Sequence, residues 1–195
     1  LPGVCSGEVV LALAVTEPGG KPGSLRTHAV RHGADYLIKG SKTAVGNGIA
    51  ADLILLACRT DGNNGESGVS LIMVETGRPG VQRIRSAPGC AQPSAAELHL
   101  DNVRVPAGNL LGEAGRGLDY LSQAGAQERL LAAIAAASRL EYLLDLTLDH
   151  LRQPDTSGHC SWDLQHTRKK VADIKARAVA LRVLVDHYLE RRMRH

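Results

Sequence analysis

The sequence predicts an α+β fold, in which a small β-barrel or β-sandwich domain precedes an antiparallel hairpin of two helices. Short apolar runs separated by turn residues fill the first part of the 195-residue chain, and this spacing is typical of a sandwich or small barrel. After residue 115 the apolar residues recur at steps of three and four, the spacing of one helix face. We therefore expect a β-domain over residues 1–110 and a helical region over residues 111–195.

Five apolar segments are predicted as strands: residues 9–15, 36–40, 53–58, 69–74 and 98–105. Pro18 and the two glycines after it close the first of them, because this pair of residue types favours a turn. The polar stretch 61–68 is a second turn, between the third and fourth strands.

The two predicted helices each carry one apolar face. The first face comprises Leu130, Ile134, Ala137, Leu140, Leu144, Leu148 and Leu151. This helix should end before Pro154, which cannot continue it. The second helix should begin near Ser161 as N-cap. A short turn makes the two helices antiparallel neighbours, and because neither can bury its whole face on the other, the hairpin is expected to be part of a four-helix bundle.

Composition narrows the classes of function. The net charge is only +3, and the basic runs 168–170 and 191–194 contain no aromatic residue that could stack on bases, so we expect no nucleic acid partner. No apolar run approaches the roughly 20 residues that span a bilayer. The four cysteines are far apart, which is typical of reduced thiols. His159 and Cys160 are the only close pair of these residue types, too few ligands for a metal site.

Motifs in a fixed order add a resemblance. Residues 13–19 read LAVTEPG, 36–42 YLIKGSK, 47–52 NGIAAD, 101–106 DNVRVP, 109–112 NLLG, 115–117 GRG, 127–130 QERL and 165–168 QHTR. Together they resemble the acyl-CoA dehydrogenases, flavoenzymes that introduce a trans double bond between C2 and C3 of acyl thioesters. That family has a helical, a β and a second helical domain. The resemblance implies that the first domain and the last two helices are absent here.

The resemblance implies a catalytic base at Glu128. Removal of the weakly acidic α-proton calls for a carboxylate in a dry pocket, and long-chain and isovaleryl-type members carry it on the helix that begins with a motif like 127–130. Gln127 and Arg129 would then contribute to the substrate pocket. The plain alternative is that Glu128 is a solvated residue near a helix start and Arg129 an ordinary ion-pair partner.

The resemblance also implies FAD as cofactor. Backbone groups of Leu13, Val15 and Thr16 would contact the flavin, and the Thr16 hydroxyl would bond the ring. A strand-end threonine that bonds its own backbone is the alternative. Where the family has an aromatic residue followed by Ile-Thr against the flavin, this chain has Ala44, Val45 and Gly46, which remove ring cover and a hydroxyl.

Two further departures concern the cofactor phosphates. The segment after the TEP motif is shortened, and Ser24 is the residue that could replace the family's phosphate-binding serine. The family's R-x-x-F-G loop, which reaches a partner's FAD, corresponds here to residues 154–158, with Pro154 in place of Arg and Ser157 in place of Phe. An arginine–phosphate pair contributes about 1.5–3 kcal/mol, so its loss weakens the expectation of FAD.

Three functions therefore stay open. The first is a flavin-dependent dehydrogenase that acts on an acyl-CoA substrate, forms a homo- or hetero-oligomer through its helices and passes electrons to an electron-transfer flavoprotein. The second is a catalytically impaired or FAD-free truncated homologue that serves as a scaffold or heteromer subunit. The third is a non-functional remnant. The expected compartment is the cytoplasm, with the mitochondrial matrix as alternative.

Overall fold

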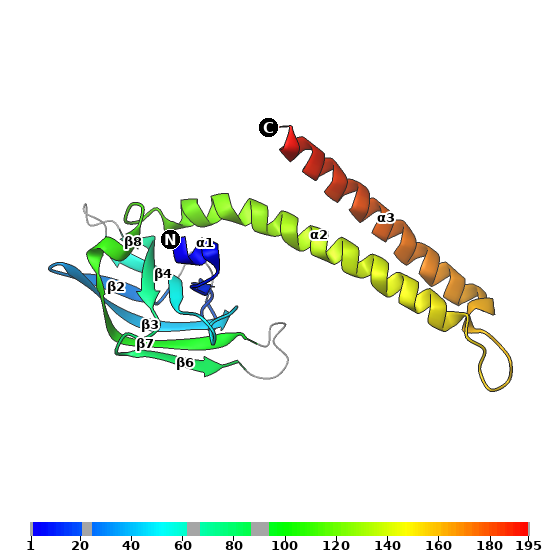
Figure 1. Ribbon diagram of the computed structural model, residues 1–195, viewed down its shortest axis with the longest axis horizontal. Helices are drawn as coiled ribbons and strands as arrows, with labels where there is room; N and C mark the ends of the chain where they lie inside the picture. Colours follow the sequence, from blue (N-terminus) through cyan, green and yellow to red (C-terminus); the bar gives the residue numbers. More distant parts are fainter. Residues whose placement is uncertain (1, 21–24, 62–66, 87–93, 195) are drawn as a thin grey trace. The chain divides into compact units, whose positions relative to one another are not determined.

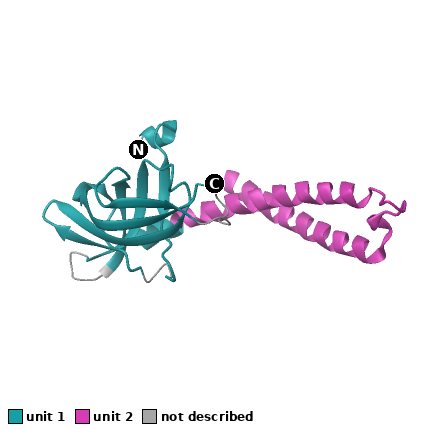
Figure 2. Ribbon diagram, turned by 90° about the horizontal axis from the view of Figure 1, so that it is seen from below, with its two compact units in different colours: residues 1–122 teal, residues 123–195 magenta. Residues whose placement is uncertain are grey.

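The computed structural model describes residues 2–20, 25–61, 67–86 and 94–194 of the chain. It divides into two compact units, residues 1–122 and 123–195, which Figure 2 shows in teal and magenta. The first unit contains the strands and the second contains most of the two long helices.

The first unit is a β-domain built on one mixed sheet (Figure 1). Its strands are β1 (Leu11–Ala14), β2 (His28–His32), β3 (Asp35–Val45), β4 (Leu53–Asp61), β5 (Ser67–Glu75), β6 (Val81–Arg85), β7 (Ala96–Pro106) and β8 (Leu110–Leu111). The order is β6-β7-β3-β2-β4-β5-β8, and β1 pairs in parallel with β4. A short helix, α1 (Pro2–Ser6), precedes β1, and a single 3₁₀ turn, η1 (Ala107–Asn109), separates β7 from β8.

All five predicted strands are present; the two-residue β8 was not predicted, nor were the longer strands β2 and β6. Both lack the apolar alternation that marks a half-buried strand. In β2 the only apolar side chains are Ala29 and Val30, and Val30 is exposed. In β6 every residue from Gln82 to Arg85 is exposed. Backbone pairing with β3 and β7 makes these segments strands. Such pairing produces no pattern of apolar residues in the sequence.

The core of the β-domain follows the two-residue period of its strands. In β7, Leu98, Leu100, Val103 and Val105 are buried while Glu97 and His99 are exposed. The shift between Leu100 and Val103 comes with Asn102, whose φ is 50°, and with a register shift against β3. One apolar cluster thus connects β1, β2, β3, β4, β5 and β7.

The second unit is the predicted antiparallel hairpin (Figure 1). Helix α2 (Gly117–Leu151) ends before Pro154 as expected. Helix α3 (Gln165–Met193) begins later than expected: its N-cap is Leu164, and residues Ser161–Asp163 form a separate 3₁₀ turn, η2. The prediction of Ser161 as N-cap is therefore wrong, since the backbone is extended at Leu164 between the two helical segments.

The first turn of α2 belongs to the β-domain. Tyr120 and Leu121 pack against a second apolar cluster that includes Leu25, Val69 and Leu71. The compact division consequently falls inside α2, after Ser122. Within the described residues, neither helix is long and apolar enough to cross a membrane.

Candidate functional site

Two chain segments of the β-domain meet at the end of β1. The Thr43 amide donates a hydrogen bond to the Thr16 carbonyl over 2.9 Å, and the Lys42 Nζ donates to the Val15 carbonyl over 3.0 Å. Residues 13–16 and residues 44–46, both expected to contact a flavin, therefore lie side by side, although about thirty residues separate them in the chain.

This junction leaves part of its surface open. Leu13 is 42% exposed, Thr16 and Ala44 are also exposed, and Val15 and Gly46 are half-buried. The Val45 side chain points into the core, so that residue can offer a ligand its backbone only. The Thr16 hydroxyl has no hydrogen-bond partner among the described residues, so it is not bonded to its own backbone there, as the alternative expected. Ser24 lies outside the described residues.

A β-bulge shapes the second segment. The pairing of β3 with β7 shifts between Lys42 and Val45, and Ala44 within the shift has a φ of 52°. A left-handed alanine costs about 1 kcal/mol or more, and bulges of this kind re-aim side chains beside functional sites. The bulge turns Ala44 outward while Val45 stays in the core.

A buried ion pair lies beneath the junction. Lys42 Nζ is 2.9 Å from Glu17 Oε1, and the two side chains are 0% and 3% exposed. The same carboxylate accepts hydrogen bonds from the amides of Arg26, over 2.6 Å, and Thr27, over 3.0 Å. Glu17 and Lys42 thus connect the end of β1, the chain that enters β2 and the far part of β3.

The pKa values of this cluster follow from burial and from these bonds. Burial alone would raise the pKa of Glu17, but hydrogen bonds from Thr27, the Arg26 amide and Lys42 outweigh it and lower the pKa to about 2. Burial lowers the pKa of Lys42, and Glu17 opposes that change. Burial also raises the pKa of the nearby Cys58 to about 12, so this thiol stays protonated and does not compete for Lys42.

Sequence reasoning assigned no role to Glu17 or Lys42, although both lie in the motifs that carry the resemblance. A signal was available. Tyr36 and Ile38 mark the inward face of β3, and Lys42 continues that face two steps later, as a charged residue at an inward position. A charge there requires a buried partner, and Glu17 is the acidic residue of the adjoining segment.

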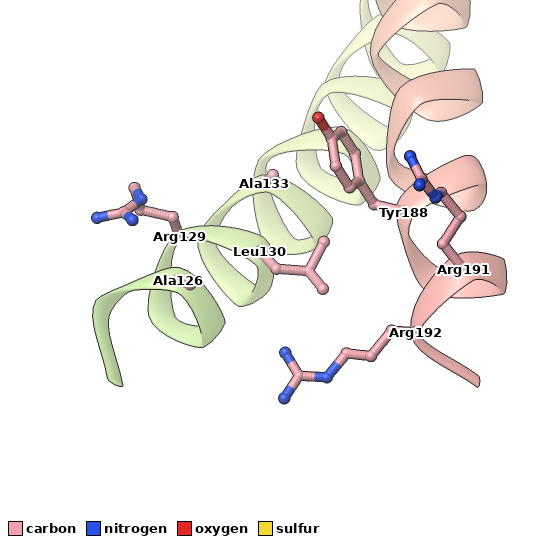
Figure 3. A pocket seen from close by; sticks show the side chains of 7 residues that line it. All are labelled: Ala126, Arg129, Leu130, Ala133, Tyr188, Arg191 and Arg192. Atoms are coloured by element: carbon pink, nitrogen blue, oxygen red, sulfur yellow. The ribbon is translucent and has the colours of Figure 1, made fainter. Parts of the chain in front are cut away.

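The other expected site residues lie on α2. Gln127, Glu128 and Arg129 are all exposed in the described hairpin. A pocket of about 910 Å³ opens beside them between α2 and α3 (Figure 3). Its lining residues are Ala126, Arg129, Leu130, Ala133, Tyr188, Arg191 and Arg192. Figure 3 shows Leu130 and Tyr188 on facing sides of the gap and Arg192 extending from α3 toward α2. Its apolar lining with three cations at the edge is suited to an apolar ligand that carries negative charge.

The loop between α2 and α3 closes on itself. One Asp155 oxygen accepts hydrogen bonds from the amides of Ser157 and His159, and the Asp155 amide donates to the His159 carbonyl over 2.9 Å. Gly158 completes the turn with a φ of 79°. Pro154 and Ser157 stand where the resemblance implies an arginine and a phenylalanine, and Asp155 places a carboxylate beside the expected cationic contact to a phosphate.

Comparisons with known proteins agree with this architecture. The acyl-CoA dehydrogenase middle-domain model matches residues 12–103, and the acyl-CoA dehydrogenase C-terminal-domain model matches residues 115–195. The long-chain specific acyl-CoA dehydrogenase of Rattus norvegicus mitochondria is 34% identical over 97% of the chain, which covers 46% of that protein.

Solved structures match equally well. An acyl-CoA dehydrogenase from Geobacillus kaustophilus superimposes with a TM-score of 0.88 at 36% identity, over 98% of this chain and 52% of that one. A glutaryl-CoA dehydrogenase from Mycobacterium smegmatis in complex with FADH2 gives a TM-score of 0.83 at 26% identity, over 95% and 48%. The chain spans about half the length of the relatives it matches. Both parts of the fold match the same family in the same order, and the chain belongs to the acyl-CoA dehydrogenase family, with residues 12–103 matching its middle domain and residues 115–195 its C-terminal domain.

Proposed function

We propose that this chain takes part in the FAD-dependent α,β-dehydrogenation of an acyl-CoA thioester to the trans-2-enoyl-CoA. The observation that carries the proposal is the junction of residues 13–16 with residues 43–46, which hydrogen bonds join at an open surface of the β-domain. The relationship to the rat long-chain dehydrogenase and to a flavin-bearing glutaryl-CoA dehydrogenase supports it.

The residues present fit the edge of a flavin better than its face. The Thr16 hydroxyl, which has no partner among the described residues, and the exposed strand end offer donors that do not depend on a large side chain. Ala44 provides little cover for a ring, a loss of about 2–3 kcal/mol relative to a buried aromatic side chain, and Gly46 has no hydroxyl. FAD would therefore be held chiefly by backbone groups of Leu13, Val15 and Thr16.

On this proposal, a bound flavin would accept a hydride from the β-carbon of the thioester. Glu128 accepts the α-proton, and Gln127 and Arg129 orient the substrate. The pocket beside Arg129 supports this assignment, because its apolar lining suits an acyl chain and Arg191 and Arg192 suit an anionic group. Such a base acts efficiently only where water is excluded, so further protein has to cover the exposed Glu128.

Flavin titration of the full chain tests the proposal. We expect FAD fluorescence to be quenched on binding and the flavin absorbance to bleach when an acyl-CoA is added. Glu128→Gln should bind FAD normally but slow the bleaching by about 10²–10⁴-fold, the usual contribution of a general base. Asp149→Asn, an exposed carboxylate on the same helix, is the matched control and should bleach like the wild type. A full chain that binds FAD yet never bleaches with any acyl-CoA would contradict the proposal.

A second function, an FAD-free subunit that keeps the scaffold, is favoured by three substitutions toward one ligand. Ala44 and Gly46 lack the groups expected against the ring, and Pro154 replaces an arginine expected to contact a phosphate, with the Asp155 carboxylate beside it. This alternative predicts a colourless protein that binds no FAD but associates with a flavin-bearing relative.

Association through the helices and electron transfer to an electron-transfer flavoprotein complete the proposal. The hairpin exposes large apolar side chains, among them Leu131, Tyr142, Leu146 and Val183, at 66%, 66%, 54% and 61%. Exposed apolar surface on this scale marks an interface. We propose that copies of this chain or a relative cover it in a homo- or hetero-oligomer, in the cytoplasm or in a mitochondrial matrix.

A further inference from the structure

The buried pair Glu17–Lys42 does more than occupy the interior of the β-domain. Burying two charges costs free energy that replacement by apolar side chains would avoid. Here the cation is directed at one backbone atom, the Val15 carbonyl oxygen, 3.0 Å from Nζ. That carbonyl belongs to the same peptide unit as the Thr16 amide, in the strand end assigned above to the flavin.

The peptide geometry decides where the opposite pole of that unit points. No cis peptide bond occurs among the described residues, and in a trans peptide the carbonyl and the N–H point in opposite directions. With its carbonyl bonded to Lys42, the Val15–Thr16 peptide directs the Thr16 N–H away from the buried pair. Thr16 itself is exposed.

A cation on the carbonyl also changes the strength of the donor. Hydrogen bonds in a chain polarise one another, and the effect is larger where water does not screen the charge. Lys42 is 0% exposed, and Glu17 holds it in place while two backbone amides hold Glu17. The ammonium is thus fixed at one end of a peptide whose N–H becomes a better donor at the other end.

We propose that Lys42, held by Glu17, is a positioning residue of the flavin site, which fixes and polarises the Val15–Thr16 peptide so that the Thr16 N–H binds an electron-rich edge of the isoalloxazine. The inference rests on the proposed function, since it assumes that FAD binds at this strand end. Reduction places negative charge on the flavin ring. A donor aimed at that charge stabilises the reduced form more than the oxidised form.

Three variants of the full chain separate this role from simple stabilisation. Glu17→Gln/Lys42→Met removes both charges together, which avoids leaving one buried charge unpaired. Lys42→Met alone removes the cation. Ser70→Ala is the matched control: it deletes a buried hydroxyl that bonds Thr60 and the Gly115 amide, so it destabilises the same domain without touching residues 15–17.

The measurements are FAD affinity by fluorescence, flavin midpoint potential, and amide hydrogen exchange of the flavin-free protein. We expect the double variant to bind FAD about tenfold more weakly, as loss of a charge-assisted bond implies, and to have a more negative midpoint potential. The Thr43 amide, which bonds the Thr16 carbonyl, should exchange faster. Ser70→Ala should retain the wild-type affinity, potential and Thr43 exchange.

The outcomes are distinguishable. If wild type and double variant bind FAD with equal affinity and equal potential, the role of Lys42 is refuted while the proposed function stands. If the wild type binds no FAD, both are refuted and the FAD-free subunit is favoured. If Ser70→Ala produces the same changes as the double variant, the effect is general destabilisation and the positioning role is refuted.

Discussion

The two units of this chain differ in how completely they bury their apolar side chains. The β-domain encloses a continuous apolar cluster from six strands, with side chains such as Ile38, Leu56 and Val103 at 0% exposure. The hairpin buries only five hydrophobic side chains among its described residues: Ala137, Leu144, Val171, Ala178 and Val185. Meanwhile Leu131 and Tyr142 stay largely in solvent. The β-domain therefore buries its apolar side chains within itself, whereas the hairpin leaves several large apolar side chains exposed.

Their ion pairs differ in the same way. Lys42–Glu17 is sealed in the β-domain, while Arg182–Glu141 joins the two helices with about a third of each side chain exposed. Water screens the second pair and leaves the first almost unscreened. The buried ion pair is thus part of the structure of the β-domain, whereas the exposed ion pair contributes little to the hairpin.

The largest expected effect is the loss of the buried cation. Lys42→Met leaves Glu17 buried without its counter-ion and should lower the free energy of unfolding by about 3–5 kcal/mol, measured by urea denaturation. Arg182→Met in the hairpin should leave the urea midpoint close to the wild-type value. Equal effects of the two substitutions would remove the contrast between the units.

A smaller difference is expected between two leucines. Leu98→Ala creates a cavity in the β-domain core, where Leu98 is 0% exposed, and should cost about 2–4 kcal/mol. Leu131→Ala removes a side chain that is 66% exposed and should change stability little in the isolated chain. If Leu131→Ala instead weakens association with a partner, this helix face is an interface, in contrast to the closed core around Leu98.

The pH dependence of stability should come mainly from the β-domain. Glu17 has a folded-state pKa of about 2, against its ordinary value of 4.5. A lowered carboxyl pKa stabilises the fold above pH 4.5, and this stabilisation is lost as the pH falls from 4.5 through about 2. The difference corresponds to about 3 kcal/mol. Urea midpoints between pH 5 and pH 2 should fall steeply in the wild type and less so in Glu17→Gln, and parallel curves would contradict this origin.

The smallest effect concerns the bulge of β3. Ala44 has a φ of 52°, a conformation that glycine adopts without strain, so Ala44→Gly should stabilise the β-domain by about 1 kcal/mol. Thermal denaturation measures it, and Ala50→Gly, at an exposed position with no positive φ, is the control. A melting temperature that drops in Ala44→Gly would show that the bulge is not strained.

The strands that were predicted share one property. Residues 53–58 and 98–105 alternate or are wholly apolar because they face a core, and that pattern is local. Strands β2 and β6 lack that pattern, because Val30 and Ile84 are exposed among polar residues, and pairing with β3 and β7 makes these segments strands. The start of α3 shows a similar limit: Ser161 has the side chain of an N-cap, but the backbone at Leu164 separates its 3₁₀ turn from the helix.

The residues of the candidate site were likewise predicted only in part. Motifs indicated Leu13, Val15, Thr16 and Ala44, and the structure joins their segments through Thr43 and Lys42. The role of the Glu17–Lys42 pair was not predicted. The inward position of Lys42 in β3 is a sequence signal, but only the structure shows that Glu17, twenty-five residues earlier, is its buried partner.

The amino-acid sequence by itself determined the two-part architecture, the family and the segments that carry the site, since each depends on local periodicity or on motifs that are contiguous in the chain. Only the tertiary structure decided which polar groups meet. The fold brings the end of β1 beside β3, where Lys42 bonds the Val15 carbonyl, and burial fixes the Lys42–Glu17 charge pair behind that one peptide bond.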